Sequence, residues 1–141
     1  MPFIEMIDDN LPALKELSKQ GKVNFDWSIK SSPKAKTVIL VNNGEINGLV
    51  EFQKEMGTHK MWLIEVVRDY RGSTIAGKLL AYVGRDSLKE GNDGFFFFEP
   101  KDSLRNYYMD KYGAKISAGR NLYFDTAATQ KLISTYLTQN D

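Results

Sequence analysis

The 141-residue sequence contains no cysteine. This absence excludes disulfide bonds, thiolate zinc sites and cysteine nucleophiles together. An excess of one charge sign is also missing: 19 basic and 18 acidic residues leave a net charge of +1, which indicates neither a nucleic acid nor a membrane surface as partner. No apolar run approaches the roughly 20 residues of a bilayer span, and residues 1–10 lack the features of a signal peptide. We expect a cytoplasmic protein.

Length and composition predict one folded domain. The residues are 42% hydrophobic and 26% charged, which is ordinary for a globular protein and allows a core without disulfide or metal staples. The sequence has no internal repeat, low-complexity segment or linker. We therefore expect a single domain over residues 1–141 that binds no metal.

Hydrophobic periodicity and turn residues predict a series of strands and helices. The strongest local signal is Asn43-Gly44, a pair typical of a type I′ turn, between two β-rich runs. Asp125 and either Asp9 or Asn10 are suited to cap helices. The expected elements are a strand at 2–7, a helix at 8–21, an extended segment at 23–29, a hairpin at 36–55, a strand at 59–67, a helix at 73–90, a strand at 94–99, a helix at 101–113, a hairpin at 114–125 and a helix at 126–139.

The order of these elements also predicts how the strands pair. The helix at 73–90 joins two strands as a crossover, so the strands at 59–67 and 94–99 should run parallel. The remaining strands follow one another through short turns or hairpins and should be antiparallel. We therefore predict an α+β domain with a mixed, mostly antiparallel sheet, a parallel central strand pair and flanking helices.

The stretch VVRDYRGSTIAGKLLAYV, residues 66–83, has three interpretations. Residues 72–78 match the G-x-x-x-x-G-K core of a nucleotide P-loop, but Leu79 occupies the position of its magnesium-binding Ser or Thr. The same residues also fit a turn entering a helix, where free backbone N–H groups and Arg71 would hold a phosphate. A capped amphipathic helix is the third interpretation, but it does not explain why Gly77 lies in the first turn, where glycine costs about 1 kcal/mol.

The second interpretation carries a family resemblance. The chain resembles the Gcn5-related N-acetyltransferases (GNAT family), whose motif Arg/Gln-x-x-Gly-x-Gly/Ala follows a strand and leads into a helix with paired leucines. Thr74 replaces the middle glycine, which matters if that position needs a positive φ. The order of elements follows the family from residue 1 to about residue 125, and the helix at 126–139 is an addition to the domain. The matching residues are Arg71, Ile75, Ala76, Leu79 and Leu80.

The resemblance implies acetyl-coenzyme A as co-substrate. Its pyrophosphate would lie on the backbone of residues 71–77 with Lys78 near a phosphate. Its pantetheine arm would hydrogen-bond along the strand at Val66 and Val67, with Asn106 as a further contact. The implied coenzyme-binding residues are Val66, Val67, Arg68, Arg71, Gly72, Ser73, Thr74, Ile75, Ala76, Gly77, Lys78 and Asn106.

The implied reaction moves an acetyl group to a primary amine of a small molecule or protein, by direct attack on the thioester. Tyr108 is the candidate general acid, although it also fits an aromatic stripe that packs the helix on the sheet. Glu65 is the candidate base; a salt-bridged glutamate is its alternative, and Glu51 and the lone His59 are further candidates. The competing hypothesis is a non-catalytic acyl-coenzyme-A-binding regulatory module. Either protein could be a monomer or a homodimer.

Overall fold

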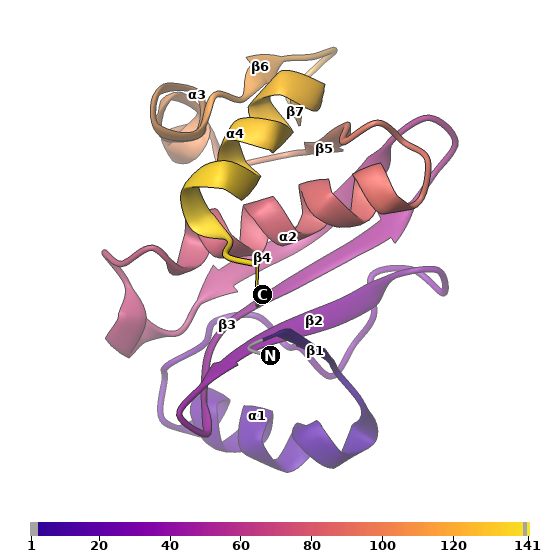
Figure 1. Ribbon diagram of the computed structural model, residues 1–141. Helices are drawn as coiled ribbons and strands as arrows, with labels where there is room; N and C mark the ends of the chain where they lie inside the picture. The colour runs from indigo at the N-terminus through magenta and orange to yellow at the C-terminus, as the bar shows by residue number, and fades with distance from the viewer. Residues whose placement is uncertain (1–2, 140) are drawn as a thin grey trace.

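A seven-stranded sheet organises the computed structural model, which describes residues 3–139 and 141 (Figure 1). The strand order is β1-β2-β3-β4-β5-β7-β6. Short 3-10 turns at Asp8–Asn10, Arg68–Tyr70 and Asp102–Leu104 precede α1, α2 and α3. The elements are β1 (Phe3–Glu5), α1 (Leu11–Lys19), β2 (Lys36–Asn42), β3 (Glu45–Lys54), β4 (His59–Val66), α2 (Ile75–Lys89), β5 (Phe96–Phe98), α3 (Arg105–Tyr112), β6 (Lys115–Ile116), β7 (Leu122–Phe124) and α4 (Thr126–Tyr136).

The predicted fold class and strand directions are confirmed. β4 and β5 are parallel, and the other neighbours in the sheet are antiparallel. Asn43 and Gly44 have φ angles of 53° and 78°, as a type I′ turn between β2 and β3 requires. Asp125 caps α4 by accepting the Ala128 N–H at 2.9 Å. Gly113 ends α3 in the left-handed conformation.

Two local predictions differ from the structure. Asn10 precedes α1, but its side chain accepts the Ile7 N–H instead of capping the helix. Residues 23–29 form no strand, because the backbone N–H groups of Asn24 and Phe25 and the indole N–H of Trp27 all donate to the Glu65 carboxylate of β4. Their alternation fails too, since Val23 and Trp27 are buried while Ile29 is 66% exposed. The part of the first predicted strand at residue 2 lies outside the described residues.

Two apolar cores lie on opposite faces of the sheet. α1 and the loop after it cover one face, with Leu14, Trp27 and Leu49 at its centre. α2 and α4 lie side by side on the other face, where Leu79 and Phe124 are fully buried (Figure 1). None of the helices in the described part of the chain combines the length and hydrophobicity that crossing a membrane demands.

Two glycines of α2 let α4 approach closely. A Cβ atom built on Gly77 would lie 2.5 Å from the Tyr136 ring, and one on Gly84 would lie 2.5 Å from the Thr129 side chain. Thr129 is fully buried and donates its hydroxyl to the Gly94 carbonyl. The C-terminal helix therefore covers its own domain, and Tyr136 accounts for a glycine in the first turn of α2.

We predict that Gly77→Ala destabilises the protein by about 1–3 kcal/mol, because overpacking against Tyr136 outweighs the better helix propensity of alanine. In a Tyr136→Ala background the same substitution should instead stabilise by up to about 1 kcal/mol, since only the propensity gain remains. Urea unfolding of the four proteins measures both effects. The same sign in both backgrounds would contradict this packing.

Candidate functional site

A cleft opens where β4 and β5 part. The two strands pair at two positions only, His59 with Phe96 and Lys60 with Phe97. Beyond Lys60 a cleft of about 490 Å³ separates β4 from the end of β5 and from α3. Its lining residues are Asn24, Phe25, Met61, Trp62, Leu63, Ile64, Glu65, Val66, Arg71, Phe98, Glu99, Pro100, Lys101, Leu104 and Tyr108.

The backbone of β4 has a free edge in this cleft. The Val67 N–H donates to the Asn47 carbonyl at 2.9 Å, so Val67 is bonded toward β3. Alternate residues of a strand bond to the same neighbour, which directs the peptide groups of Val66 toward the cleft. The Arg71 Nε–H donates to the Val66 carbonyl oxygen at 3.4 Å. Because Arg71 lines the cleft, this bond also indicates that the Val66 carbonyl faces the cleft. Of the two predicted pantetheine contacts, Val66 is available and the N–H of Val67 is engaged.

The turn before α2 is exposed and unstrained. Gly72 has a φ of 82° with open space around it, so the positive φ falls there and not at Thr74. Thr74 has a φ of −85°, which suits a β-branched residue, and the strain considered for this position does not arise. The Ser73 hydroxyl donates to the Tyr70 carbonyl and accepts the Ile75 N–H at 3.4 Å, which closes the turn.

The first helical turn of α2 has backbone N–H groups that lie next to the loop before the helix. The Lys78 N–H makes the first i→i−4 bond, to Thr74 at 3.1 Å, so the N–H groups of Ala76 and Gly77 precede the helical ladder. Such groups and the helix dipole favour an anion. The side chain of Ile75 is buried in the core.

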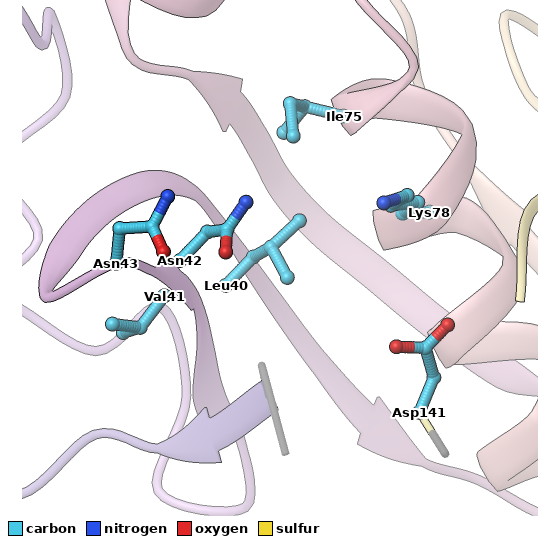
Figure 2. A pocket seen from close by; sticks show the side chains of 7 residues that line it. All are labelled: Leu40, Val41, Asn42, Asn43, Ile75, Lys78 and Asp141. Carbon is cyan, nitrogen blue, oxygen red and sulfur yellow. The ribbon is translucent and has the colours of Figure 1, made fainter. Parts of the chain in front are cut away.

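Other predicted coenzyme contacts lie apart from the cleft. Lys78 lines a second pocket, of about 400 Å³, between α2 and the β2–β3 turn; its neighbours there include Asn42 and Asn43 (Figure 2). Arg68 is exposed and its backbone N–H donates to the Lys22 carbonyl. Asn106 is exposed on α3 and is not among the residues lining the cleft.

Tyr108 forms part of the cleft wall on α3. Its ring is 9% exposed and packs edge-on against Phe98, with 4.8 Å between centroids. Burial raises the pKa of Tyr108 to about 12, with a smaller contribution from Tyr107. The hydroxyl therefore stays protonated at neutral pH and can donate a proton or a hydrogen bond into the cleft.

Glu65 lines the same cleft, and its carboxylate is already engaged. Oε2 accepts the Asn24 N–H at 2.6 Å. Oε1 accepts the Phe25 N–H at 3.2 Å and the Trp27 indole N–H at 2.9 Å. The Arg71 guanidinium is 4.0 Å away. Glu65 thus joins the loop after α1 to β4.

Glu51 and His59 have partners outside the cleft. The Glu51 carboxylate accepts the backbone N–H and the hydroxyl of Ser31. His59 is fully buried at the paired end of β4, where Nε2 is 2.8 Å from Asp86 and Nδ1 is 3.0 Å from the Asn92 amide nitrogen. Burial tends to raise the pKa of Asp86, but the His59 hydrogen bond and the charge of Lys36 bring it below its ordinary value.

The family resemblance also suggests Phe25, Trp27, Arg120 and Tyr123 as residues that would line the acceptor side of the site. Phe25 lines the cleft as expected, and Trp27 lies beside it at 6.1 Å between ring centroids. Tyr123 stacks on Phe95 and does not line the cleft. The sequence analysis did not identify Pro100 and the other lining residues after β5. This polar segment becomes a wall of the cleft only because β4 and β5 separate there.

No protein-family model matches the sequence, and no curated protein matches it significantly. Solved structures share the fold. An acetyltransferase of the GNAT family from Staphylococcus aureus superposes with a TM-score of 0.64 and 16% identity, over 88% of this chain and 98% of that chain. The ribosomal-protein-S18-alanine N-acetyltransferase from Escherichia coli gives 0.65 and 16%, over 86% and 89%. AtaTR bound with acetyl-CoA gives 0.55 and 17%, over 71% and 73%. The chain therefore has the GNAT fold.

The raised pKa of Tyr108 predicts a pH-dependent stability. Between pH 10 and 12 a tyrosine in the unfolded chain ionises while Tyr108 stays protonated, so the stabilisation that its protonated form gives is complete below pH 10 and lost as pH rises through 12. The unfolding free energy of the wild type should fall relative to Tyr108→Phe by about 2 kcal/mol over this range. Denaturant unfolding at several pH values measures the difference. Exposed Tyr107, whose pKa is lowered chiefly by its hydrogen bond with Tyr112, is the control: the unfolding free energy of the wild type should show no such fall relative to Tyr107→Phe.

Proposed function

We propose that this protein is an acetyl-CoA-dependent N-acetyltransferase that acts on a primary amine of a small molecule or a protein. One observation carries the proposal: the free edge of β4 at Val66 runs from Glu65 to the exposed turn before α2, with Arg71 and Tyr108 both lining the cleft. The GNAT fold, and the acetyl-CoA bound to the similar AtaTR, support this ligand for the cleft.

The diphosphate of the coenzyme would bind to the turn before α2, and its pantetheine arm would bind to the edge of β4. The diphosphate would accept hydrogen bonds from the N–H groups between Gly72 and Ala76, with Arg71 as its charged partner. The Arg71 guanidinium, half exposed, would then exchange its contact with the Val66 carbonyl for a phosphate oxygen. The pantetheine arm would run along Val66 in the manner of an added strand, which is how an unpaired strand edge binds extended chains.

The proposed chemistry follows from the groups that line the cleft. A neutral amine attacks the thioester carbonyl, a C–N bond forms, and the C–S bond breaks. The Val66 N–H is placed to stabilise the oxyanion, and Tyr108 donates its proton to the leaving thiolate. The proton released by the amine passes to water in the open cleft, because three donors already occupy the Glu65 carboxylate.

A non-catalytic acyl-CoA-binding module is the second candidate. It is favoured by the same engaged carboxylate, since Glu65 has few lone-pair positions left for an amine proton. The two candidates predict equal coenzyme binding and differ in turnover. Release of free coenzyme A from acetyl-CoA in the presence of an amine would identify an enzyme, and binding without such release would identify a binding module.

Thermal unfolding with added ligands tests the coenzyme site. At a concentration of 100 Kd, acetyl-CoA and coenzyme A should each stabilise the fold by about 2.7 kcal/mol, which raises Tm by several degrees. ATP with magnesium should give no comparable shift. A panel of polyamines, amino acids, aminoglycosides and peptide N-termini then tests thiol release. A shift with ATP-magnesium alone would favour the P-loop interpretation, and a coenzyme shift without release across the panel would favour the binding module.

Arg71→Ala should weaken acetyl-CoA binding about 3- to 30-fold, because it removes a charge-assisted hydrogen bond to a phosphate. Titration calorimetry measures the change. Lys89→Ala, which removes an exposed positive charge from the last turn of the same helix, is the matched control and should bind as the wild type does. Equal affinities for Arg71→Ala and the wild type would place the diphosphate elsewhere.

A further inference from the structure

The loop between α1 and β2 reaches the cleft without any regular structure of its own. Residues 20–35 contain no helix or strand, yet Asn24 and Phe25 line the cleft beside Glu65. An irregular segment has no ladder of backbone hydrogen bonds to fix it. The Lys22 carbonyl accepts the Arg68 N–H, and side-chain contacts with the sheet hold the loop further along.

Glu65 supplies three of these side-chain contacts. It lies on the face of β4 that α1 and the loop cover, together with Leu63 and Val67, and is 7% exposed. Its two oxygens accept hydrogen bonds from two consecutive loop amides and from the Trp27 indole. A buried carboxylate is stable only when such donors satisfy it. The loop and the carboxylate thus depend on one another.

A second buried carboxylate holds the same loop further along. Glu51 of β3 is 1% exposed and accepts two hydrogen bonds from Ser31. Trp27 is buried between the two anchors and contacts Phe25 edge-on. The anchors fix the loop at both ends, and the Glu65 end is the one that forms the cleft wall.

We propose that Glu65 is a positioning residue, which holds Phe25 and Asn24 as the wall that receives the carbon skeleton of the acceptor amine, and that it does not take the amine's proton. The proposal rests on the proposed function for the identity of the acceptor. The geometry assigns Phe25 as the specificity-determining residue of this wall, because it is the loop side chain that is both half-buried and part of the cleft lining.

Exchange of the Trp27 indole N–H tests the anchor without any substrate. The chain has two tryptophans, so Trp62→Phe assigns the two indole resonances in an NMR spectrum. Glu65→Gln turns an amide NH₂ toward at least one loop donor, and should speed exchange of the Trp27 indole and of the Asn24 and Phe25 amides roughly tenfold or more. The Trp62 indole, bonded to Gln53 at 2.8 Å, should not change.

Two further variants keep this test decisive. Glu99→Gln removes a carboxylate from the exposed rim of the same cleft and should leave Trp27 exchange unaltered. Trp27→Phe keeps the carboxylate and removes one donor, so it serves if Glu65→Gln fails to fold; the Asn24 and Phe25 amides should then exchange several-fold faster. Unchanged exchange in both Glu65→Gln and Trp27→Phe would overturn the anchor.

Steady-state kinetics with an accepted amine distinguish positioning from proton transfer. Glu65→Gln should raise the KM for the amine about 5- to 50-fold, with kcat within about threefold, an unchanged shape of the pH profile and unchanged affinity for acetyl-CoA. A loss of 10²–10⁴ in kcat with unchanged KM would identify a general base and overturn the proposal. Because the exchange experiment needs no substrate, failure of the proposed activity and failure of the anchor are read from different measurements.

Discussion

The separation of β4 from β5 is the constraint on which the rest of the site depends. The two strands share only two residue pairs before β5 ends at Phe98 and the chain turns toward α3. β3 pairs with the whole of β4 on its other edge, through a bulge opposite Glu51 and Phe52. β4 therefore continues past its neighbour with one edge unpaired, and unpaired strand edges bind extended partners. In this protein the free edge is enclosed by α3 and by the turn before α2.

Buried polar contacts hold the elements around this opening. His59, Asp86 and Asn92 join the paired end of β4 to the end of α2 and to the loop that precedes β5. The glycine contacts of α2 bring Tyr136 and Thr129 of α4 against its outer face, so this helix is buried on two sides. At the open end, Glu65 fixes the loop after α1. The cleft is thus formed by rigid elements joined through side chains distant in sequence.

Local rules were sufficient for most of the fold. The Asn43-Gly44 turn follows from the positive φ angles that these residues tolerate, and the parallel strand pair follows from the handedness and length of the crossover. The turn before α2 was also predicted, although the glycine that carries its positive φ is Gly72 and not the residue at the position of Thr74. In each case the residues that determine the local structure lie in the same element or in elements that follow one another in the sequence.

The sequence-based predictions were wrong or incomplete where the structure depends on contacts between residues far apart in the sequence. The alternation at residues 23–29 predicted an extended segment, but the partner that fixes this segment is the Glu65 carboxylate, 38 to 41 residues away. Gly77 was attributed to phosphate access, whereas its contact with Tyr136, 59 positions later, explains its size. Glu65 was predicted as a candidate base, with a salt-bridged glutamate as the alternative, and it is buried with three hydrogen-bond donors. Its three donors could not be read from the sequence, because none of them lies on a neighbouring strand.

A crystal structure of the protein with coenzyme A tests the central claim most directly. We predict the diphosphate on the peptide nitrogens between Gly72 and Ala76, and the pantetheine arm along Val66 with its thiol near Tyr108. Coenzyme A bound only in the pocket between α2 and the β2–β3 turn, or a diphosphate with no contact to those nitrogens, would contradict it.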